Sequence, residues 1–212
     1  MKKYLLLGVT MLMALTACQS KCPEVKCAES AKQNSQEDKM SADEAILSRL
    51  SVRSFQEGRE IPKDVLTAIL KAGMAAPSAM DRRPWSFVVI TQKEQLSALA
   101  AAHPHAKMLL SASAAIIPLA TVDLSQPGME KAFWIQDMSA VTENILLSAH
   151  SRGLGAVWVG VYGNDDRVKA ISEFLQLPEG TVPFSIIPLG YPTAKGEPKD
   201  KFDESRIHWE KF

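Results

Sequence analysis

Cysteine is missing from most of this 212-residue chain. The only three cysteines are Cys18, Cys22 and Cys27, which all lie within the first 27 residues. A thiol nucleophile in the rest of the chain is therefore excluded. The C-x3-C-x4-C spacing has no histidine nearby, so it only weakly indicates a metal site.

Several motifs and any excess of charge are missing as well. The sequence has no G-x-G-x-x-G, no P-loop and no G-x-S-x-G. It therefore lacks the motifs that usually identify a dinucleotide-binding fold, an NTPase or a hydrolase. Lysine and arginine number 24, against 24 aspartates and glutamates. This balance gives no overall reason to expect a nucleic-acid partner.

The N-terminal stretch MKKYLLLGVTMLMALTAC has two lysines followed by an apolar run. That run is too short to span a bilayer comfortably, which indicates an export signal. Leu15 to Cys18, Leu-Thr-Ala-Cys, resembles the lipobox of bacterial lipoproteins. The resemblance implies a signal peptide over residues 1–17, lipidation at Cys18, and a lipid anchor at a membrane surface of the cell envelope. An ordinary secretory signal is the alternative.

The segment after the leader, residues 18–41, is rich in Lys, Glu, Ser and Gln and is predicted to be a flexible tether. If Cys18 carries lipid, Cys22 and Cys27 are left as candidates for a disulfide in an oxidising compartment. One folded domain is predicted over residues 42–212. Its first helix begins after Ser41, with Glu44 at the capping-box position.

Helical periodicity and short apolar runs alternate along the predicted domain. Helices are predicted within residues 61–76, 93–102, 130–153 and 165–175, and strands within 85–91, 114–122, 155–161 and 182–192. The strand within 85–91 is expected to be buried, because it is a short apolar run with β-branched residues. Residues 130–153 are apolar over a wide arc, so they are expected to form a central helix that ends at Gly153. Pro118 places its strand near a sheet edge or weakens it. The alternation predicts an α/β or α+β domain.

Basic residues gather at two places far apart in the sequence. Arg49 and Arg53 flank Ser51, and two guanidiniums with a hydroxyl can hold a phosphate through charge-assisted bonds. A solvated basic patch explains the same spacing equally well. Lys199 and Lys201 stand in a C-terminal loop and, taken alone, indicate only a solvated charge run.

The histidines give weaker indications. His103 and His105 share one loop without a clear third ligand, which favours surface residues over a metal site. No metal is therefore expected. His150 falls late in the predicted central helix and is expected to cap or pack.

Four separated motifs, SRLSVRSF, APSAMDRRPWSFVVI, GLGAVWVG and IIPLGYPTAKGEPKDKF, resemble the nitroreductase family of FMN-dependent oxidoreductases. The resemblance covers residues 44 to 212. It implies an α+β sandwich with a central, mostly antiparallel sheet flanked by helices, and a homodimer with FMN in two interfacial clefts. It also implies ping-pong hydride transfer from NAD(P)H or another donor to a small acceptor such as a nitroaromatic or a quinone. The flavin N5 carries this chemistry, so no catalytic side chain is expected.

The same resemblance assigns the cofactor-binding residues in four groups. Arg49, Ser51 and Arg53 bind the phosphate and the ribityl or pyrimidine end, and Lys199 and Lys201 join them to neutralise the phosphate. Pro77, Ser78 and Ala79 line the isoalloxazine from the partner subunit. The backbone of Trp158, Val159 and Gly160 passes along the ring, where an N–H reaches N5 or O4.

Position 81 departs from the usual family pattern, in which an asparagine faces the flavin. Here Asp81 can accept a hydrogen bond from flavin N3–H but cannot donate one. A carboxylate beside the ring disfavours the anionic reduced flavin unless a cation neutralises it. We therefore expect Asp81 to pair with Arg82 or Arg83 and these arginines to tune the potential or the substrate choice.

Export conflicts with NAD(P)H as the donor, because NAD(P)H is scarce outside the cytoplasm. Two alternatives to the enzyme follow. One is an envelope-anchored FMN-binding electron relay that does not turn over NAD(P)H. The other is a non-catalytic lipoprotein binding module that reuses the scaffold.

Overall fold

The computed structural model describes residues 40–122 and 130–212, which belong to one compact unit, Asp38–Phe212. The predicted signal peptide, Cys18, Cys22, Cys27 and all but the last two residues of the predicted tether lie outside the described residues. Among the described helices, none has both the length and the apolar character needed to cross a membrane.

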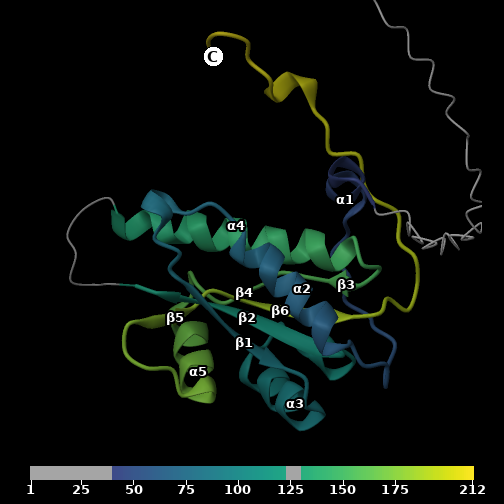
Figure 1. Ribbon diagram of the computed structural model, residues 1–212, viewed down its shortest axis with the longest axis vertical. Helices are drawn as coiled ribbons and strands as arrows, with labels where there is room; N and C mark the ends of the chain where they lie inside the picture. Colours follow the sequence, from purple (N-terminus) through teal and green to yellow (C-terminus); the bar gives the residue numbers. More distant parts are fainter. Residues whose placement is uncertain (1–39, 123–129) are drawn as a thin grey trace, which may run out of the picture. The chain divides into compact units, whose positions relative to one another are not determined.

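A single antiparallel sheet runs through the described domain (Figure 1). Its centre is β2, which pairs with β1 along one side and with β5 and β6 along the other, and β6 also pairs with β3 and β4. The strands are β1 (Trp85–Ile90), β2 (Ala114–Thr121), β3 (Gly155–Ala156), β4 (Val159–Gly160), β5 (Thr181–Pro183) and β6 (Ser185–Gly190).

Helices cover both faces of this sheet (Figure 1). Two buried clusters fill the two layers, one between the sheet and α2 and α4, the other between the sheet and α3 and α5. The α-helices are α1 (Ala42–Ser48), α2 (Lys63–Met74), α3 (Lys93–Ala102), α4 (Glu130–His150) and α5 (Asp165–Leu175). The expected α+β class and helix-flanked antiparallel sheet are confirmed.

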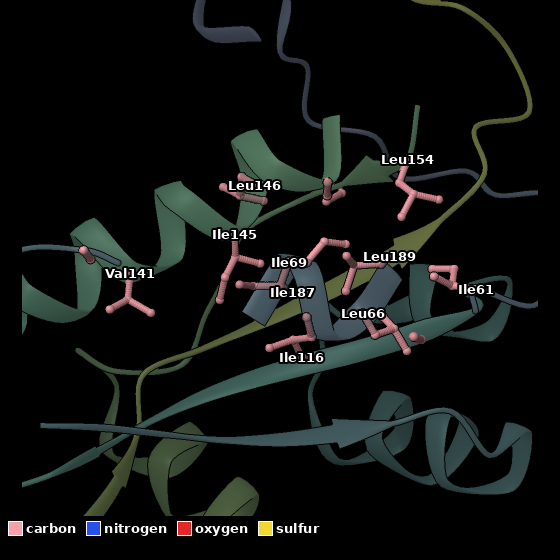
Figure 2. Packing of buried hydrophobic residues seen from close by; sticks show 14 residues of the cluster. Ile61, Leu66, Ile69, Ile116, Val141, Ile145, Leu146, Leu154, Ile187 and Leu189 are labelled. Carbon is pink, nitrogen blue, oxygen red and sulfur yellow. The ribbon is translucent and has the colours of Figure 1, made fainter. Parts of the chain in front are cut away.

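The long helix α4 is central, as its wide apolar arc predicts. Val141 and Ile145 point from α4 toward Ile69 of α2 and Ile187 of β6 (Figure 2). A Cβ added at Gly73 of α2 would lie 2.8 Å from Cγ1 of Ile145, so glycine permits the close approach of the two helices. The predicted stop is also found, because Gly153 has the left-handed φ of 73° that glycine tolerates.

The capping box at the start of α1 is present as predicted. The Glu44 backbone N–H donates to Ser41 Oγ at 3.2 Å, and the Ser41 N–H donates to Glu44 Oε2 at 2.7 Å. Two orphan donors of the first helical turn are satisfied in this way.

The expectation that Pro118 marks a sheet edge is wrong, since β2 is paired on both sides. The Pro118 carbonyl accepts from the Phe184 N–H at 2.9 Å, and Phe184 lies between β5 and β6. The missing N–H of Pro118 therefore falls where β2 changes neighbour from β6 to β5. A central strand tolerates proline at such a break in the ladder.

Two other strand expectations need correction. Residues 155–161 form two short strands, β3 and β4, separated at Val157 and Trp158, instead of one. Strand β1 is not buried throughout, because among the described strands it pairs with β2 alone, and it leaves Ser86 and Val89 exposed.

Candidate functional site

The segment carrying the first basic cluster is fixed to α4 at the end of α1. Arg49 Nε donates to Glu143 Oε1 at 2.9 Å, and the Arg49 side chain is only 19% exposed. Ser48 Oγ lies 2.8 Å from His150 Nε2. Because Nε is bonded to Glu143, only the terminal nitrogens of Arg49 remain to bind a ligand. The predicted binding of phosphate by Arg49 is therefore limited to these nitrogens.

From Arg49 the chain continues alongside β3. The Val52 N–H donates to the Ala156 carbonyl at 2.9 Å, and Ser51 forms a parallel bridge with Ala156. Ser51 and Arg53 flank Val52 and are exposed. This pairing places the predicted phosphate binders next to the predicted ring-binding segment, although about a hundred residues separate them in the sequence.

Two of the four predicted groups meet at one cavity. A cavity of ≈ 190 Å³ is lined by Arg53, Trp158, Val159 and Gly160, together with His103, His105, Met108, Val157 and Arg167. Within the described residues, neither Arg53 nor Arg167 has a carboxylate partner; each donates weakly, at 3.4 Å, to a backbone carbonyl. The cavity thus combines positive charge with an accessible peptide backbone.

The loop from Pro77 to Arg83 is a second, separate part of the predicted site. Met80, Asp81 and Arg83 have left-handed φ values of 54°, 53° and 50°. Such values cost non-glycine residues about 1–2 kcal/mol each, so the surrounding contacts must hold the loop in shape. One contact closes the loop on itself, because the Arg83 N–H donates to Ser78 Oγ at 3.0 Å.

Asp137 of α4 anchors this loop from outside. Its Oδ1 accepts from the Ala79 N–H at 2.9 Å, and the residue is only 8% exposed. Sequence reasoning did not identify Asp137 as a site residue. Its position as an acidic side chain on a helix apolar over a wide arc was the available signal.

The expected partner of Asp81 is Arg83. The pair is bidentate, with Arg83 Nε 2.7 Å from Oδ1 and Nη2 2.5 Å from Oδ2 of Asp81. Hydrogen bonds from Arg83 lower the pKa of Asp81, and the same bonds raise the pKa of Arg83. Both side chains are exposed, at 70% and 64%, so the pair contributes little to stability.

Lys199 and Lys201 lie in the exposed stretch that follows β6. The stretch leaves the sheet and passes near α1 (Figure 1). Its first part packs against the Arg49 segment, because a Cβ at Gly196 would lie 2.7 Å from Leu50 Cδ1. The two lysines follow this contact, but they do not line the cavity beside Arg53.

Helix α4 anchors both the loop of Pro77 to Arg83 and the Arg49 segment, so the positions of the anchors along α4 indicate how far apart the two segments lie in one chain. The loop of Pro77 to Arg83 is anchored at Asp137, whereas the Arg49 segment is anchored at Glu143 and His150. At about 1.5 Å rise per residue these anchors lie roughly 9 and 20 Å along the axis from Asp137. The loop and the basic segment are therefore held near different parts of one helix.

The expectation that His103 is a surface residue is wrong, whereas His105 is exposed as expected. His103 is fully buried at the end of α3, with its Nε2 3.1 Å from the Gly160 carbonyl oxygen. In the described part of the chain, no three histidine, cysteine or acidic side chains are grouped so that they could hold a metal. His150 bonds to Ser48 and packs at the end of α4.

Comparison with known proteins identifies the family and the fold of this chain. The family model described as the Nitroreductase family matches residues 46–135 and 105–191. A protein of Methanothermobacter thermautotrophicus, provisionally named NADH dehydrogenase/NAD(P)H nitroreductase, is 46% identical over 175 residues, which cover 82% of this chain and 89% of that protein.

Solved structures of similar proteins share the fold. A crystal structure from Bacteroides thetaiotaomicron, with the same provisional name, has a TM-score of 0.73 at 42% identity and covers 79% of this chain and 96% of its own. An FMN-dependent nitroreductase of Clostridium difficile has a TM-score of 0.69 at 29% identity and covers 77% and 96%. The family model spans well over half of the chain and close relatives are matched over most of their length, so the chain belongs to the nitroreductase family.

Proposed function

We propose that this protein is an FMN-dependent oxidoreductase that transfers a hydride in ping-pong order from NAD(P)H to a small acceptor such as a nitroaromatic or a quinone. The observation that carries the proposal is the cavity where the Arg53 guanidinium meets the backbone of Trp158 to Gly160. The names of relatives support the cofactor and the donor, because they include an FMN-dependent nitroreductase and an NADPH-flavin oxidoreductase of Vibrio harveyi.

The residues present fit FMN in their chemistry. A Cβ added at Gly160 would meet no atom within 4 Å, so a flat ring has room to approach this backbone. A phosphate dianion needs several cationic donors, which Arg53 and the terminal nitrogens of Arg49 supply from one segment. Lys199 and Lys201 complete this set from the C-terminal stretch, with Ser51 as a hydroxyl donor.

When bound, FMN supplies the redox chemistry by accepting a hydride at N5 and passing reducing equivalents to the acceptor. The protein chain binds FMN, orients its ring and tunes its redox potential. The Trp158–Gly160 backbone fixes the edge of the ring and offers N–H donors. Pro77, Ser78 and Ala79 form a small-residue wall that limits access of water to the ring.

We further propose that the site is completed in a homodimer. The loop of Pro77 to Ala79 and the basic segment are held near different parts of α4 in one chain, so a second copy supplies the wall for each cavity. The C-terminal stretch leaves large apolar side chains uncovered, which favours burial against a partner. They are Phe202 (73% exposed), Trp209 (83%) and Phe212 (106%).

The Asp81–Arg83 pair gives this site a feature of its own. In the proposed dimer the pair lies beside the ring, and Arg83 neutralises the carboxylate that would otherwise lower the flavin potential. We expect Asp81→Asn to release Arg83 and raise the midpoint potential of bound FMN. An unchanged FMN affinity and potential would show that Asp81 does not act on the flavin.

The deciding experiment is the visible spectrum of the purified protein after reconstitution with FMN, followed by anaerobic titration with NADH and NADPH. A flavin spectrum bleached by either donor supports the proposed enzyme. Bound flavin that neither donor reduces would point to the electron relay. A colourless protein that ignores added FMN would refute flavin binding and favour the binding module.

We also propose that the protein is exported and anchored by lipid at Cys18, on the strength of the leader and its Leu-Thr-Ala-Cys sequence. Mass spectrometry of the N-terminal peptide from membrane fractions tests this. A diacylated Cys18 peptide is expected, and its loss in Cys18→Ser with release of the protein from membranes is the control. An intact Met1 in the mature protein would refute export through this leader.

A further inference from the structure

The fully buried imidazole of His103 connects the end of α3 to β4. His103 has no exposed surface, and both of its ring nitrogens have partners. Nδ1 lies 3.2 Å from the His105 N–H, and Nε2 lies 3.1 Å from the Gly160 carbonyl oxygen. A polar side chain buried this deeply keeps its place only when its hydrogen bonds are made.

These two partners determine the protonation of the ring. Nδ1 faces an N–H donor, so it must accept, and Nε2 faces a carbonyl, so it must donate. His103 is therefore the neutral tautomer with hydrogen on Nε2. Burial lowers the pKa of His103, and this effect together with the nearby charge of Arg167 outweighs the hydrogen bond to the Gly160 carbonyl, which raises it. The pKa is therefore lowered, which keeps the neutral form at neutral pH.

The carbonyl that His103 holds belongs to a short strand at one side of the sheet. Strand β4 has two residues, Val159 and Gly160, and among the described strands it pairs with β6 alone. The Val161 N–H donates to the Phe184 carbonyl at 3.2 Å, so Val161 faces that neighbour and Gly160, one residue earlier, faces the opposite side. On that opposite side, the Gly160 carbonyl oxygen lies 3.1 Å from His103 Nε2 and accepts a hydrogen bond from Arg167 Nη1 at 3.4 Å.

We propose that His103 is a positioning residue for the flavin: by donating from Nε2 to the Gly160 carbonyl it fixes the peptide along which the ring lies. This inference rests on the proposed function. In an extended strand the N–H and carbonyl of one residue point the same way, so holding the carbonyl also directs the Gly160 N–H toward the cavity. The buried imidazole thus determines where the ring edge finds its backbone donor.

Three substitutions separate this role from packing. His103→Gln keeps an N–H donor at the position of Nε2, His103→Asn places its amide at the position of Nδ1 and cannot reach Gly160, and His103→Leu removes both bonds. Asn144→Ala is the matched control, because it removes another hydrogen bond from a side chain to the backbone, from Asn144 Nδ2 to the Ala72 carbonyl at 3.1 Å, and neither residue lines the cavity. The readouts are amide hydrogen exchange of residues 157–163 without FMN, the Kd for FMN, and the midpoint potential of bound FMN.

We expect His103→Leu and His103→Asn to speed exchange over residues 157–163 and weaken FMN binding roughly tenfold, the size expected for one lost buried hydrogen bond. The midpoint potential should shift with them. His103→Gln should stay within about threefold of the wild type, and Asn144→Ala should leave exchange over residues 157–163 unchanged and the Kd for FMN within about twofold.

Equal behaviour of His103→Gln and His103→Asn would overturn the inference, and this comparison decides even if His103→Leu does not fold. Unchanged exchange, affinity and potential in His103→Leu would also overturn it. A wild-type protein that does not bind FMN would refute the proposed function instead, and the exchange measurement would still show whether His103 holds β4.

Discussion

Replacing Asp137 by alanine tests whether α4 preorganises the loop of Pro77 to Arg83. Asp137 Oδ1 accepts from the Ala79 N–H at 2.9 Å, and the residue is 8% exposed. Without this acceptor the Ala79 N–H loses its partner, which costs about 1–3 kcal/mol. The loop already contains three left-handed residues at about 1–2 kcal/mol each, so it has little stability of its own to compensate.

In Asp137→Ala we expect the free energy of unfolding to fall by about 1–3 kcal/mol in urea titrations. If FMN binding must re-form the loop, the Kd for FMN rises by up to the same free energy, which is roughly 5- to 150-fold. Fluorescence quenching of FMN measures this Kd. Asp137→Asn keeps an amide oxygen at the same place, so its free energy of unfolding and its Kd for FMN should stay close to those of the wild type.

Asn144→Ala is the matched control on the same helix. Asn144 Nδ2 donates to the Ala72 carbonyl at 3.1 Å, so its loss also removes one bond between α4 and the α2 region but leaves the loop untouched. It should lower stability by about 1 kcal/mol and leave the Kd for FMN within about twofold. If Asp137→Ala and Asn144→Ala changed the Kd equally, the idea that Asp137 preorganises a flavin wall would be refuted.

Three further predictions follow from buried groups and from the C-terminal stretch. Burial lowers the pKa of both His103 and His150, so the unfolded chain binds protons more readily, and the free energy of unfolding should fall as pH drops below about 6.5, by up to about 1.4 kcal/mol per pH unit for each histidine. In urea unfolding at several pH values, the free energy of unfolding of His103→Gln should depend less steeply on pH than that of the wild type. An equal dependence on pH in the two proteins would contradict the assignment. Gly190→Ala should cost about 1–3 kcal/mol in thermal unfolding, because its Cβ would lie 2.8 Å from Cβ and Cγ of buried Phe55, whereas Gly160→Ala, with no atom within 4 Å, should cost less than about 1 kcal/mol but weaken FMN binding. In the proposed homodimer the C-terminal stretch is buried, so removing residues 199–212 should give a monomer in light scattering where the full chain gives a dimer, and should weaken FMN binding at least tenfold. A truncated protein that stays dimeric would show that the stretch is not needed for assembly.

Local patterns predicted the elements well because each reports one physical requirement. The capping box at Ser41 and Glu44, the stop at Gly153 and the apolar arc of α4 all follow from rules within one helix. The strand containing Pro118 was predicted correctly, but the expectation that it lies at a sheet edge was wrong, because the proline rule does not take into account that β2 changes partner at that residue. Which strand lies beside which is decided by packing across the whole domain.

The same limit explains which site residues were missed. The Arg49 segment and the Trp158–Gly160 segment were predicted from a family resemblance, and the structure places them side by side. His103 and Asp137 were not assigned to the site because their partners, Gly160 and Ala79, lie 57 and 58 residues away. No spacing within the sequence reports a hydrogen bond from a side chain to so distant a backbone group.

Polar side chains on helix α4 determine where the segments that pack against the helix are held. A central helix buried on several sides would be simplest with apolar residues throughout, yet Asp137, Glu143, Asn144 and His150 interrupt it. Each bonds to a different segment: the loop after α2, Arg49, the end of α2, and Ser48. Each bond holds its segment at one height along the helix, and the constraint is strongest at Asp137, because Asp137 is buried and a buried polar group without a partner is destabilising. The spacing of these residues on α4 therefore sets the separation between the loop and the basic segment in one chain, and this separation is the basis for proposing that a second copy completes the flavin site.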